Sequence, residues 1–375
     1  MQIPRFYADL AQFLDPGKAL ILYGPRQVGK TTLLRSFLSH CPYKYKLDSG
    51  DNIRVRHILG SDDFEQIKEY AKGYDLIALD EAQRIPNIGM GIKIMMDQIP
   101  GLRLIATGSS SFALAGQVGE PLAGRKKTLT LYPVAQIELK KLYSPFELKE
   151  KLNEYLIFGG YPEVMAQDAK EKKTERLLEI VDSYLLKDIL ELEKIKNSKT
   201  VLDLLRLLAF QIGNEASLTE LGSNLKVDSK TVARYLDILE KNFIVFPVRG
   251  FSKNLRKEMT KKCKYYFFDT GIRNAVISNF NALDLRNDIG ALWENFLFME
   301  RLKQRSYLKV AANHYFWRTW SQKEIDLIEE REGKLFGYEF KWQDKLIKPP
   351  QEWVTAYPEA SYEVISPKNY LDFIT

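Results

Sequence analysis

The strongest constraint on the fold is an apolar segment that leads into a glycine-rich loop and then into a segment of helical periodicity. The loop is Gly24-Pro-Arg-Gln-Val-Gly-Lys-Thr31, with glycines at its first and sixth positions. The apolar run Leu20–Tyr23 predicts a buried strand before the loop, and the apolar residues of 33–38 share one face of a helix after it. This order predicts an α/β fold with a parallel sheet and a phosphate-binding loop.

The loop composition also assigns roles to its residues. Several backbone N–H groups have to approach one polyphosphate closely, and glycine permits the backbone angles that this requires. We expect Lys30 to bind the β- and γ-phosphates and Thr31 to offer its hydroxyl to Mg²⁺, so ATP and Mg²⁺ are the expected cofactors. The loop residues expected to contact the nucleotide are Gly24, Pro25, Arg26, Gln27, Val28, Gly29, Lys30, Thr31 and Thr32.

Two further apolar runs end in polar residues that suit a nucleotide site. The run 76–79 leads to Asp80, expected to hold Mg²⁺ with Thr31, and to Glu81, expected to polarise the attacking water. An ordinary strand that ends in a solvated acidic pair is the alternative. The run 102–106 leads to Thr107 and Ser109, whose hydroxyls are expected near the γ-phosphate, although Gly-Ser clusters also form plain turns.

These segments, with Leu122-Ala-Gly-Arg125, Phe158-Gly-Gly-Tyr-Pro-Glu163 and Tyr184–Ile189, resemble a prokaryotic AAA-type ATPase family of the DUF4143 type. The resemblance covers nearly the whole chain. It implies a C-terminal region with a winged helix and a PD-(D/E)xK nuclease-like fold. In such ATPases an arginine from a neighbouring subunit often completes the active site, so the resemblance implies a catalytic role for Arg125 and a homo-oligomer. A surface or structural arginine is the alternative.

Composition limits the class of protein. The chain has 375 residues, of which 45% are hydrophobic and 28% charged, enough for two or three packed domains. No apolar stretch approaches the roughly 20 residues of a spanning helix, and no secretory signal is evident near the N-terminus. The two cysteines, Cys41 and Cys263, predict neither a disulfide framework nor a cysteine-based zinc site. We therefore expect a cytoplasmic protein without membrane partners.

The net charge of +6 is unevenly placed, because eight basic and only two acidic residues lie between Arg249 and Arg273. Before this cluster, Ser217–Glu220 predicts a capped short helix, and residues 229–239 predict a second helix. Two strands on either side of the basic loop complete a pattern that resembles a winged helix. The residues expected to contact DNA are Lys230, Arg234, Lys253, Arg256, Lys257, Lys261, Lys262 and Lys264. A protein-docking module or a rigid spacer is the alternative.

A second group of carboxylates lies near the C-terminus. Residues 317–330 and 335–342 predict neighbouring strands, and period-two alternation places Glu339 and Lys341 on one face. This pair resembles the PD-(D/E)xK nuclease fold, with Asp326 and Glu339 as metal ligands and Lys341 beside them. Glu294 matches the acidic residue that such folds often carry on a preceding helix. Glu–Lys alternation also keeps exposed strands soluble, and a fold does not imply its usual function.

The predicted domains are an ATPase core (1–140), a helical connector or lid (141–198), a winged helix (199–278) and a nuclease-like domain (279–375). The leading hypothesis is Mg²⁺-dependent ATP hydrolysis coupled to DNA binding or remodelling, with a possible metal-dependent nuclease. The alternative is a nucleotide-driven switch or scaffold that binds proteins and keeps an inactive nuclease-like fold.

Overall fold

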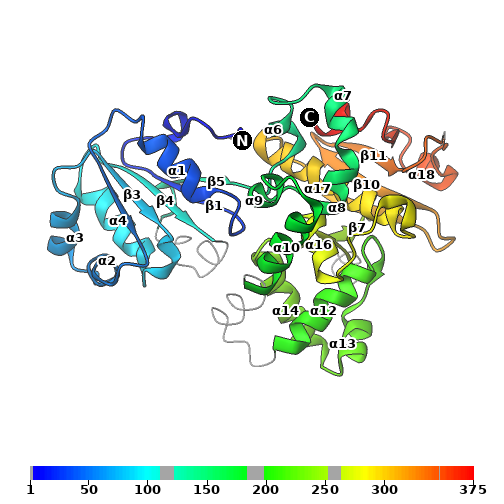
Figure 1. Ribbon diagram of the computed structural model, residues 1–375, viewed down its shortest axis with the longest axis horizontal. Helices are drawn as coiled ribbons and strands as arrows, with labels where there is room; N and C mark the ends of the chain where they lie inside the picture. The colour runs from blue at the N-terminus through cyan, green and yellow to red at the C-terminus, as the bar shows by residue number, and fades with distance from the viewer. Residues whose placement is uncertain (1–2, 110–121, 184–197, 252–262, 346) are drawn as a thin grey trace. The chain divides into compact units, whose positions relative to one another are not determined.

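The computed structural model describes residues 3–109, 122–183, 198–251, 263–345 and 347–375 (Figure 1). The chain divides into two compact units. The N-terminal unit spans Arg5–Tyr132, and the C-terminal unit comprises Met1–Pro4 and Pro133–Thr375. The segments predicted as connector, winged helix and nuclease-like domain therefore belong mostly to one compact unit.

The N-terminal unit contains one sheet of five parallel strands in the order β2-β3-β4-β1-β5. Its strands are β1 (Ala19–Tyr23), β2 (Tyr45–Ser49), β3 (Leu76–Asp80), β4 (Arg103–Gly108) and β5 (Lys126–Thr130). Its helices are α1 (Lys30–Leu38), α2 (Ile53–Leu59), α3 (Phe64–Ala71) and α4 (Ile88–Gln98), with 3-10 turns at Leu10–Phe13 and Ala82–Arg84. The predicted parallel α/β core is confirmed.

The apolar runs form the centre of this sheet because both of its faces are covered. All residues of 19–22, 76–79 and 104–107 are buried, as expected of parallel strands with helices on both faces. Helix α1 buries Leu33, Leu34, Phe37 and Leu38, which confirms the predicted apolar face. At the end of β1, Gly24 has a φ of 147°, and a Cβ there would lie 2.0 Å from the Leu131 carbonyl oxygen. Only glycine fits this position, so the loop has to turn where β1 ends.

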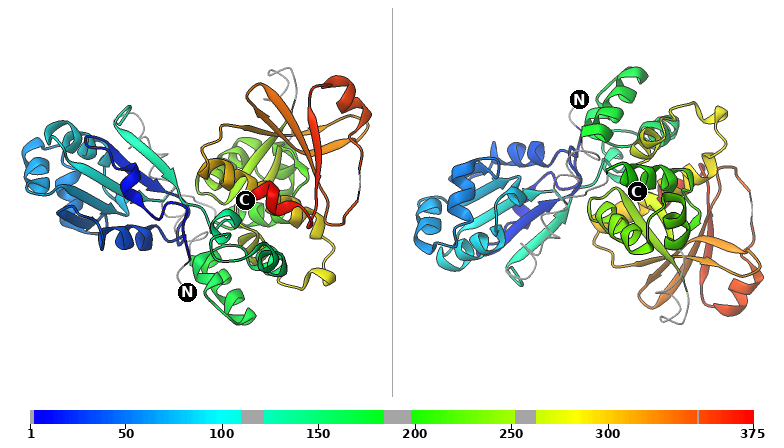
Figure 2. Two further views of the ribbon diagram at one scale, coloured as in Figure 1. Left: turned by 90° about the horizontal axis from the view of Figure 1, so that it is seen from above. Right: turned by 90° about the horizontal axis from the view of Figure 1, so that it is seen from below.

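The C-terminal unit begins with short helices and ends in an α/β arrangement around a seven-stranded sheet (Figures 1 and 2). Its helices are α6 (Gln136–Leu139), α7 (Pro145–Glu150), α8 (Leu152–Phe158), α9 (Pro162–Met165), α10 (Lys170–Ile180), α12 (Ser198–Phe210), α13 (Leu218–Leu225), α14 (Ser229–Lys241), α16 (Thr270–Val276), α17 (Ile289–Tyr307), α18 (Gln351–Ala356) and α19 (Tyr370–Ile374), with a 3-10 turn at Leu283–Leu285. Its strands are β6 (Glu215–Ala216), β7 (Val245–Gly250), β8 (Cys263–Phe267), β9 (Asn313–Arg318), β10 (Glu324–Arg331), β11 (Lys334–Phe340) and β12 (Ser361–Ile365).

The sheet order is β12-β11-β10-β9-β7-β8-β6. The link in its middle is a short parallel pairing of β7 with β9, in which Arg249 lies opposite Tyr315 and Gly250 opposite Phe316. The sheet therefore crosses residue 278, where the sequence predicts a domain boundary. The pairing joins segments that are far apart in the sequence, and such pairing leaves no local pattern from which it could be predicted.

Helices α13 and α14 form the predicted pair. The Ser217 hydroxyl accepts a hydrogen bond from the Glu220 N–H at 3.1 Å and caps α13, and Asp228 caps α14 through the Thr231 N–H at 2.9 Å. A Cβ on Gly222 would lie 2.7 Å from the Val227 carbonyl oxygen, so the turn between the helices is tight. Strands β7 and β8 follow α14 and pair antiparallel.

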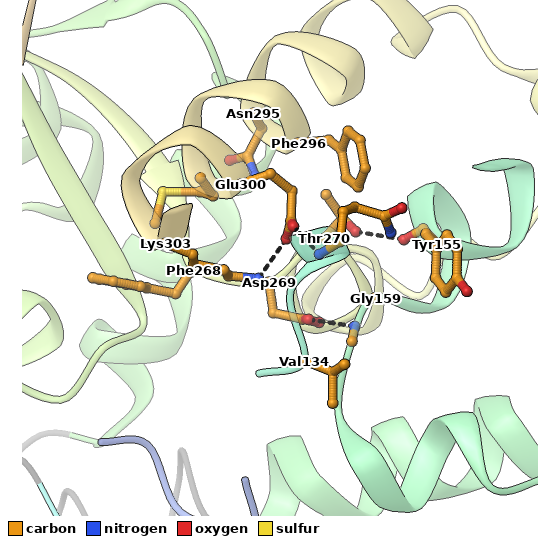
Figure 3. A pocket seen from close by; sticks show the side chains of 13 residues that line it. Val134, Tyr155, Gly159, Phe268, Asp269, Thr270, Asn295, Phe296, Glu300 and Lys303 are labelled. Carbon is orange, nitrogen blue, oxygen red and sulfur yellow. Dashed lines mark hydrogen bonds and ion pairs between the residues drawn. The ribbon is translucent and has the colours of Figure 1, made fainter. Parts of the chain in front are cut away.

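A buried carboxylate joins α8 to α16 (Figure 3). Asp269 accepts hydrogen bonds from the Gly160 N–H at 2.7 Å and from the Ile272 N–H at 3.0 Å, so it caps α16 and holds the turn after α8. Gly159 has a φ of 70°, and a Cβ there would lie 2.1 Å from an Asp269 carboxylate oxygen. The adjoining cavity of about 20 Å³ has room for about one water molecule.

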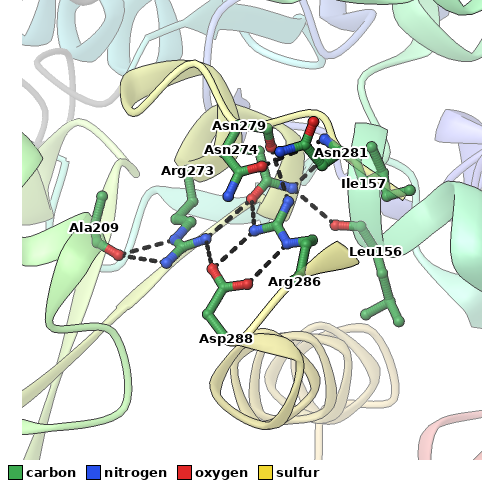
Figure 4. A network of polar contacts seen from close by, with 9 residues as sticks. All are labelled: Leu156, Ile157, Ala209, Arg273, Asn274, Asn279, Asn281, Arg286 and Asp288. Carbon is green, nitrogen blue, oxygen red and sulfur yellow. Dashed lines mark hydrogen bonds and ion pairs between the residues drawn. The ribbon is translucent and has the colours of Figure 1, made fainter. Parts of the chain in front are cut away.

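A second polar network ties α12 to α16 and α17 (Figure 4). The Arg273 guanidinium donates to the Ala209 carbonyl at 2.9 and 2.6 Å, near the end of α12. It also pairs with Asp288 at 2.5 Å, and Arg286 donates to the same carboxylate at 2.8 Å. Burial opposes ionisation of Asp288, but these two guanidinium groups lower its pKa to about 2. The buried arginines are thus neutralised and hydrogen-bonded.

Replacing Gly159 by alanine should destabilise the C-terminal unit by about 2–4 kcal/mol, because the new methyl group meets Asp269 and the backbone angle is strained. Gly290→Ala, at an open position in α17, should change stability by less than about 1 kcal/mol. Urea unfolding followed by tryptophan fluorescence measures both, since all five tryptophans lie between Trp293 and Trp353. Equal stability of the two variants would contradict this account of Gly159.

Candidate functional site

The nucleotide site lies where three parallel strands end at one edge of the sheet. Tyr23, the last residue of β1, pairs with Gly108, the last of β4, and Leu79 of β3 pairs with Ala106 of β4. The glycine loop, the acidic residues after β3 and the hydroxyl residues after β4 therefore meet at the same edge. Ligands of open α/β sheets bind at this carboxyl end.

Lys30 is the first residue of α1, and its ammonium is turned back into the loop. Only 6% of the residue is exposed, and Nζ donates to the carbonyls of Gly24 at 2.8 Å and Pro25 at 2.6 Å. Burial lowers the pKa of Lys30 to about 8, against the opposing effect of the carboxylates Glu81 and Asp80. An anion bound at the loop would therefore raise the pKa of Lys30 and favour its protonated form.

Asp80 is held from two sides by hydroxyl groups. The Thr31 hydroxyl donates to Asp80 Oδ2 at 2.9 Å, and the Thr107 hydroxyl donates to Oδ1. The Glu81 N–H contacts Asp80 Oδ1 at 3.2 Å and the Thr107 hydroxyl at 3.3 Å. Carboxylate and hydroxyl oxygens suit Mg²⁺, so Thr31 and Asp80 fit the predicted metal. Thr107 positions Asp80 here, and its role as a γ-phosphate sensor stays a prediction.

Glu81 follows β3 in a left-handed backbone conformation. Its φ is 48°, a region that non-glycine residues rarely adopt. Its Oε2 accepts a hydrogen bond from the Gln83 amide at 2.5 Å. Backbone strain of this kind collects at functional positions, and the Glu81 carboxylate is near enough to Lys30 to oppose the lowering of that lysine's pKa.

A residue with no sequence motif also supports the loop. The buried Arg5 guanidinium donates to the carbonyl of Val28, inside the loop, and to that of Tyr132 at 2.6 Å. Arg5 lies before the first strand, and an isolated arginine carries no signal of this contact. The sequence prediction missed it because the bond joins segments far apart in the chain.

Arg125 and Ser109 complete the predicted nucleotide residues. Ser109 is buried directly after β4. Arg125 pairs with Asp97 at 2.6 Å and keeps 43% of its side chain exposed. Its carbonyl accepts from the Ala19 N–H, at the start of β1, so it lies at the sheet edge opposite the glycine loop of its own chain. A role for Arg125 in its own site is therefore excluded, and the predicted role in a neighbouring subunit stays a prediction.

The structure brings the four predicted C-terminal residues together. Asp326 lies on β10, Glu339 at the end of β11, Lys341 just after β11 and Glu294 on α17. The Lys341 ammonium contacts Glu339 Oε1 at 2.5 Å, and Asp326 Oδ2 accepts from the Phe340 N–H at 2.7 Å. Burial and the nearby Glu294 and Glu339 raise the pKa of Asp326 well above its usual value.

Three residues of this cluster were not predicted there. Lys264 of β8 contacts Glu294 Oε1 at 2.9 Å and also pairs with Glu324 of β10. Only 1% of Lys264 is exposed, so the prediction that it contacts DNA is wrong: its ammonium is buried between carboxylates. The Tyr266 hydroxyl donates to the same Glu294 oxygen at 2.5 Å. Glu324 lies two residues before Asp326, and this spacing on one strand could have predicted that both side chains share a face.

The other predicted DNA contacts are partly described. Lys230 and Arg234 are exposed on α14. Lys253, Arg256, Lys257, Lys261 and Lys262 lie outside the described residues, as does Tyr184–Ile189.

A divalent metal does not fit the C-terminal cluster as it is arranged. Within the described ranges, no three His, Cys, Asp or Glu side chains lie close enough together to hold an ion. Glu294 and Glu324 are engaged by Lys264, and Glu339 by Lys341. One oxygen each of Glu294, Glu324 and Glu339 is therefore paired with an ammonium group and is not free for a metal.

Comparisons with known proteins agree with the nucleotide site. Residues 16–140 match the AAA domain, so the chain carries an AAA-type ATPase domain. Residues 149–283 and 289–358 match the domains of unknown function DUF8612 and DUF4143. The matches to the AAA domain and DUF4143 together support an AAA-type ATPase family.

The chain is also similar to uncharacterized proteins. One of Mycobacterium tuberculosis is 28% identical, with 89% of this chain and 72% of that protein covered. One of Methanocaldococcus jannaschii is 26% identical, with 87% and 75% covered. Among solved structures, a RuvB mutant of Thermotoga maritima is 16% identical. The match covers 61% of this chain and 82% of the RuvB chain, with a TM-score of 0.27. A TM-score this low supports no structural argument.

In the part of the chain that the structure describes, no helix has the length and apolar character needed to cross a membrane.

The pKa of Lys30 predicts proton uptake on nucleotide binding. Burial lowers the pKa to about 8 in the free protein, and a bound polyphosphate raises it. Near pH 8 each bound nucleotide should therefore take up roughly half a proton, and affinity should fall as pH rises further. Calorimetry with Mg²⁺-ADP in two buffers of different ionisation enthalpy measures this uptake. Lys30→Arg, which stays charged, should remove it; equal uptake by both proteins would contradict the assignment.

Proposed function

We propose that the protein is an Mg²⁺-dependent ATPase whose hydrolysis is coupled to binding or remodelling of DNA. The observation that carries the ATPase is the Asp80 carboxylate, held between Thr31 and Thr107 at the edge where the glycine loop turns. The match of residues 16–140 to the AAA domain supports it.

The residues divide the work as follows. The loop N–H groups and Lys30 bind the β- and γ-phosphates, and Thr31 with Asp80 holds Mg²⁺. The metal neutralises charge on the phosphates when it is bound. Glu81 orients the attacking water, and its carboxylate accepts a hydrogen bond from the Gln83 amide at 2.5 Å. Thr107 or Ser109 senses the γ-phosphate. Arg125 of a neighbouring subunit stabilises charge on the phosphate, which implies a homo-oligomer.

The DNA part of the proposal is supported by segment 198–267. The order α12, β6, α13, α14, β7, β8 is consistent with a winged helix, in which α14 would be the recognition helix. Lys230 and Arg234 are exposed on its first half. The segment between β7 and β8 carries five of the basic residues predicted to meet phosphate.

ATP hydrolysis with and without single-stranded, duplex and branched DNA tests the proposal. Glu81→Gln should lower kcat by about 10²–10⁴-fold while nucleotide binding is kept, because only the water-directing carboxylate is lost. Lys30→Ala serves as the blank. Stimulation of the wild-type rate by one form of DNA would identify the substrate. Full activity of Glu81→Gln would assign the water to another residue.

Replacing Lys230 and Arg234 together by alanine should weaken DNA binding about tenfold or more at moderate salt and reduce the salt dependence. Lys241→Ala is the matched control, because Lys241 lies at the far end of α14 and pairs with Asp237. Fluorescence anisotropy with labelled duplexes at several salt concentrations measures both variants. If both bind like wild type, α14 is not the DNA-contacting helix.

A second candidate function is a nucleotide-driven switch or scaffold that binds proteins and retains an inactive nuclease-like fold. The burial of Lys264 among the carboxylates favours it over a metal-dependent nuclease. ATP hydrolysis that ignores every form of DNA would favour this candidate.

A further inference from the structure

We propose that Arg5 is a positioning residue of the nucleotide site, and that it couples occupancy of the glycine loop to the C-terminal unit. The proposal rests on the nucleotide binding proposed above, and it is independent of DNA binding. Its basis is the position of one buried guanidinium, which joins the loop to a place where the chain passes from one compact unit to the other.

The Arg5 guanidinium holds one peptide group of the loop. Only 9% of Arg5 is exposed, and its Nη1 donates a hydrogen bond to the Val28 carbonyl. The peptide group between Val28 and Gly29 is trans and planar, so its C=O and its N–H point in opposite directions. Arg5 therefore fixes the Gly29 N–H on the side that faces away from the guanidinium. Backbone N–H groups of such a loop bind polyphosphate, so Arg5 acts on the phosphates through this peptide group.

The same guanidinium holds the residue at which the chain leaves the N-terminal unit. Its Nη2 donates to the Tyr132 carbonyl at 2.6 Å, and Tyr132 is the last residue of that unit. The carbonyl oxygen of the preceding residue, Leu131, lies against Gly24, where a Cβ would be only 2.0 Å away. The chain therefore leaves the unit in contact with the first residue of the loop and, through Arg5, with Val28.

The C-terminal unit holds the chain again after a single residue, Pro133. The Val134 N–H donates to the Gly160 carbonyl at 2.7 Å, and the Gln136 N–H donates to the Glu300 carboxylate at 2.6 Å. Proline fixes its own φ, so a connection of this length and composition has little freedom to absorb a displacement. A displacement of the loop on nucleotide binding therefore reaches the C-terminal unit through a short and stiff connection.

Urea unfolding of the full-length chain with and without Mg²⁺-ADP tests the coupling, because all five tryptophans lie in the C-terminal unit. The nucleotide is added at about 100 times the Kd that calorimetry gives for each protein, so that binding stabilises every N-terminal unit equally. In the wild type, Mg²⁺-ADP should raise the midpoint of the tryptophan signal by roughly 0.5 M urea or more.

Arg5→Gln should bind Mg²⁺-ADP about tenfold more weakly, because the variant loses charged hydrogen bonds that orient the loop. At the matched nucleotide concentration it should also lose at least half of the rise in the midpoint. An arginine that only stabilised the fold would lower the midpoints with and without nucleotide and leave the rise unchanged. An unchanged rise in Arg5→Gln would therefore overturn the proposal.

Arg35→Gln is the matched control, because it removes the same charge from an exposed position on α1. It should keep both the affinity and the rise in the midpoint. An equal loss in Arg35→Gln would show that charge alone, and not the position of Arg5, decides the coupling, and would overturn the proposal.

An insertion of Gly-Ser-Gly between Tyr132 and Pro133 tests the connection itself and leaves Arg5 and the loop unchanged. Affinity for Mg²⁺-ADP should stay within about threefold of wild type, while the rise in the midpoint should be lost, because a flexible linker absorbs the displacement. A rise that survives the insertion would overturn the proposal. The insertion also decides the question if Arg5→Gln does not fold.

The same measurements separate this proposal from the function on which it rests. A wild-type protein that binds no Mg²⁺-ADP would overturn both. Binding of Mg²⁺-ADP without any rise in the midpoint of the tryptophan signal would overturn the coupling alone and leave the nucleotide site as proposed.

Discussion

The parallel register of β1, β4 and β3 is the constraint on which the nucleotide site depends. It ends three strands at one end of the sheet, so residues 49 and 27 positions apart come within hydrogen-bond distance. Asp80 then has a hydroxyl from the loop on one side and a hydroxyl from β4 on the other. Both hydroxyl groups are held in position, because the buried strands are fixed by packing against helices on both faces.

Most of this site could be predicted from sequence because its signals are local. A strand, six loop residues and a helix follow one another directly, and each acidic or hydroxyl residue stands at the end of an apolar run. Each of these signals can be recognised within one short segment. Hydrophobic periodicity predicts the strand, and the end of the strand predicts where the following polar side chain lies. Arg5 could not be predicted, because its contacts with Val28 and Tyr132 have no local pattern.

The C-terminal cluster shows where prediction from sequence ends. Alternation along β11 correctly placed Glu339 and Lys341 on one face. Lys264, however, stands among basic residues in the sequence, and composition assigned it to the same surface as its neighbours. In the structure, however, Lys264 of β8 lies against Glu294 of α17 and Glu324 of β10. These contacts depend on how distant segments pack together, so they could not be predicted from the residues around Lys264. The same kind of pairing, of β7 with β9, joins strands on either side of residue 278 into one sheet.

The position of Lys264 in β8 has a mechanical consequence. The strand that follows the basic segment is fastened at its first residues by a buried ammonium among carboxylates, and pulling that group out would leave unpaired charges in a dry environment. Strands β7 and β8 are therefore anchored at the end nearest the basic segment, where paired strands usually fray.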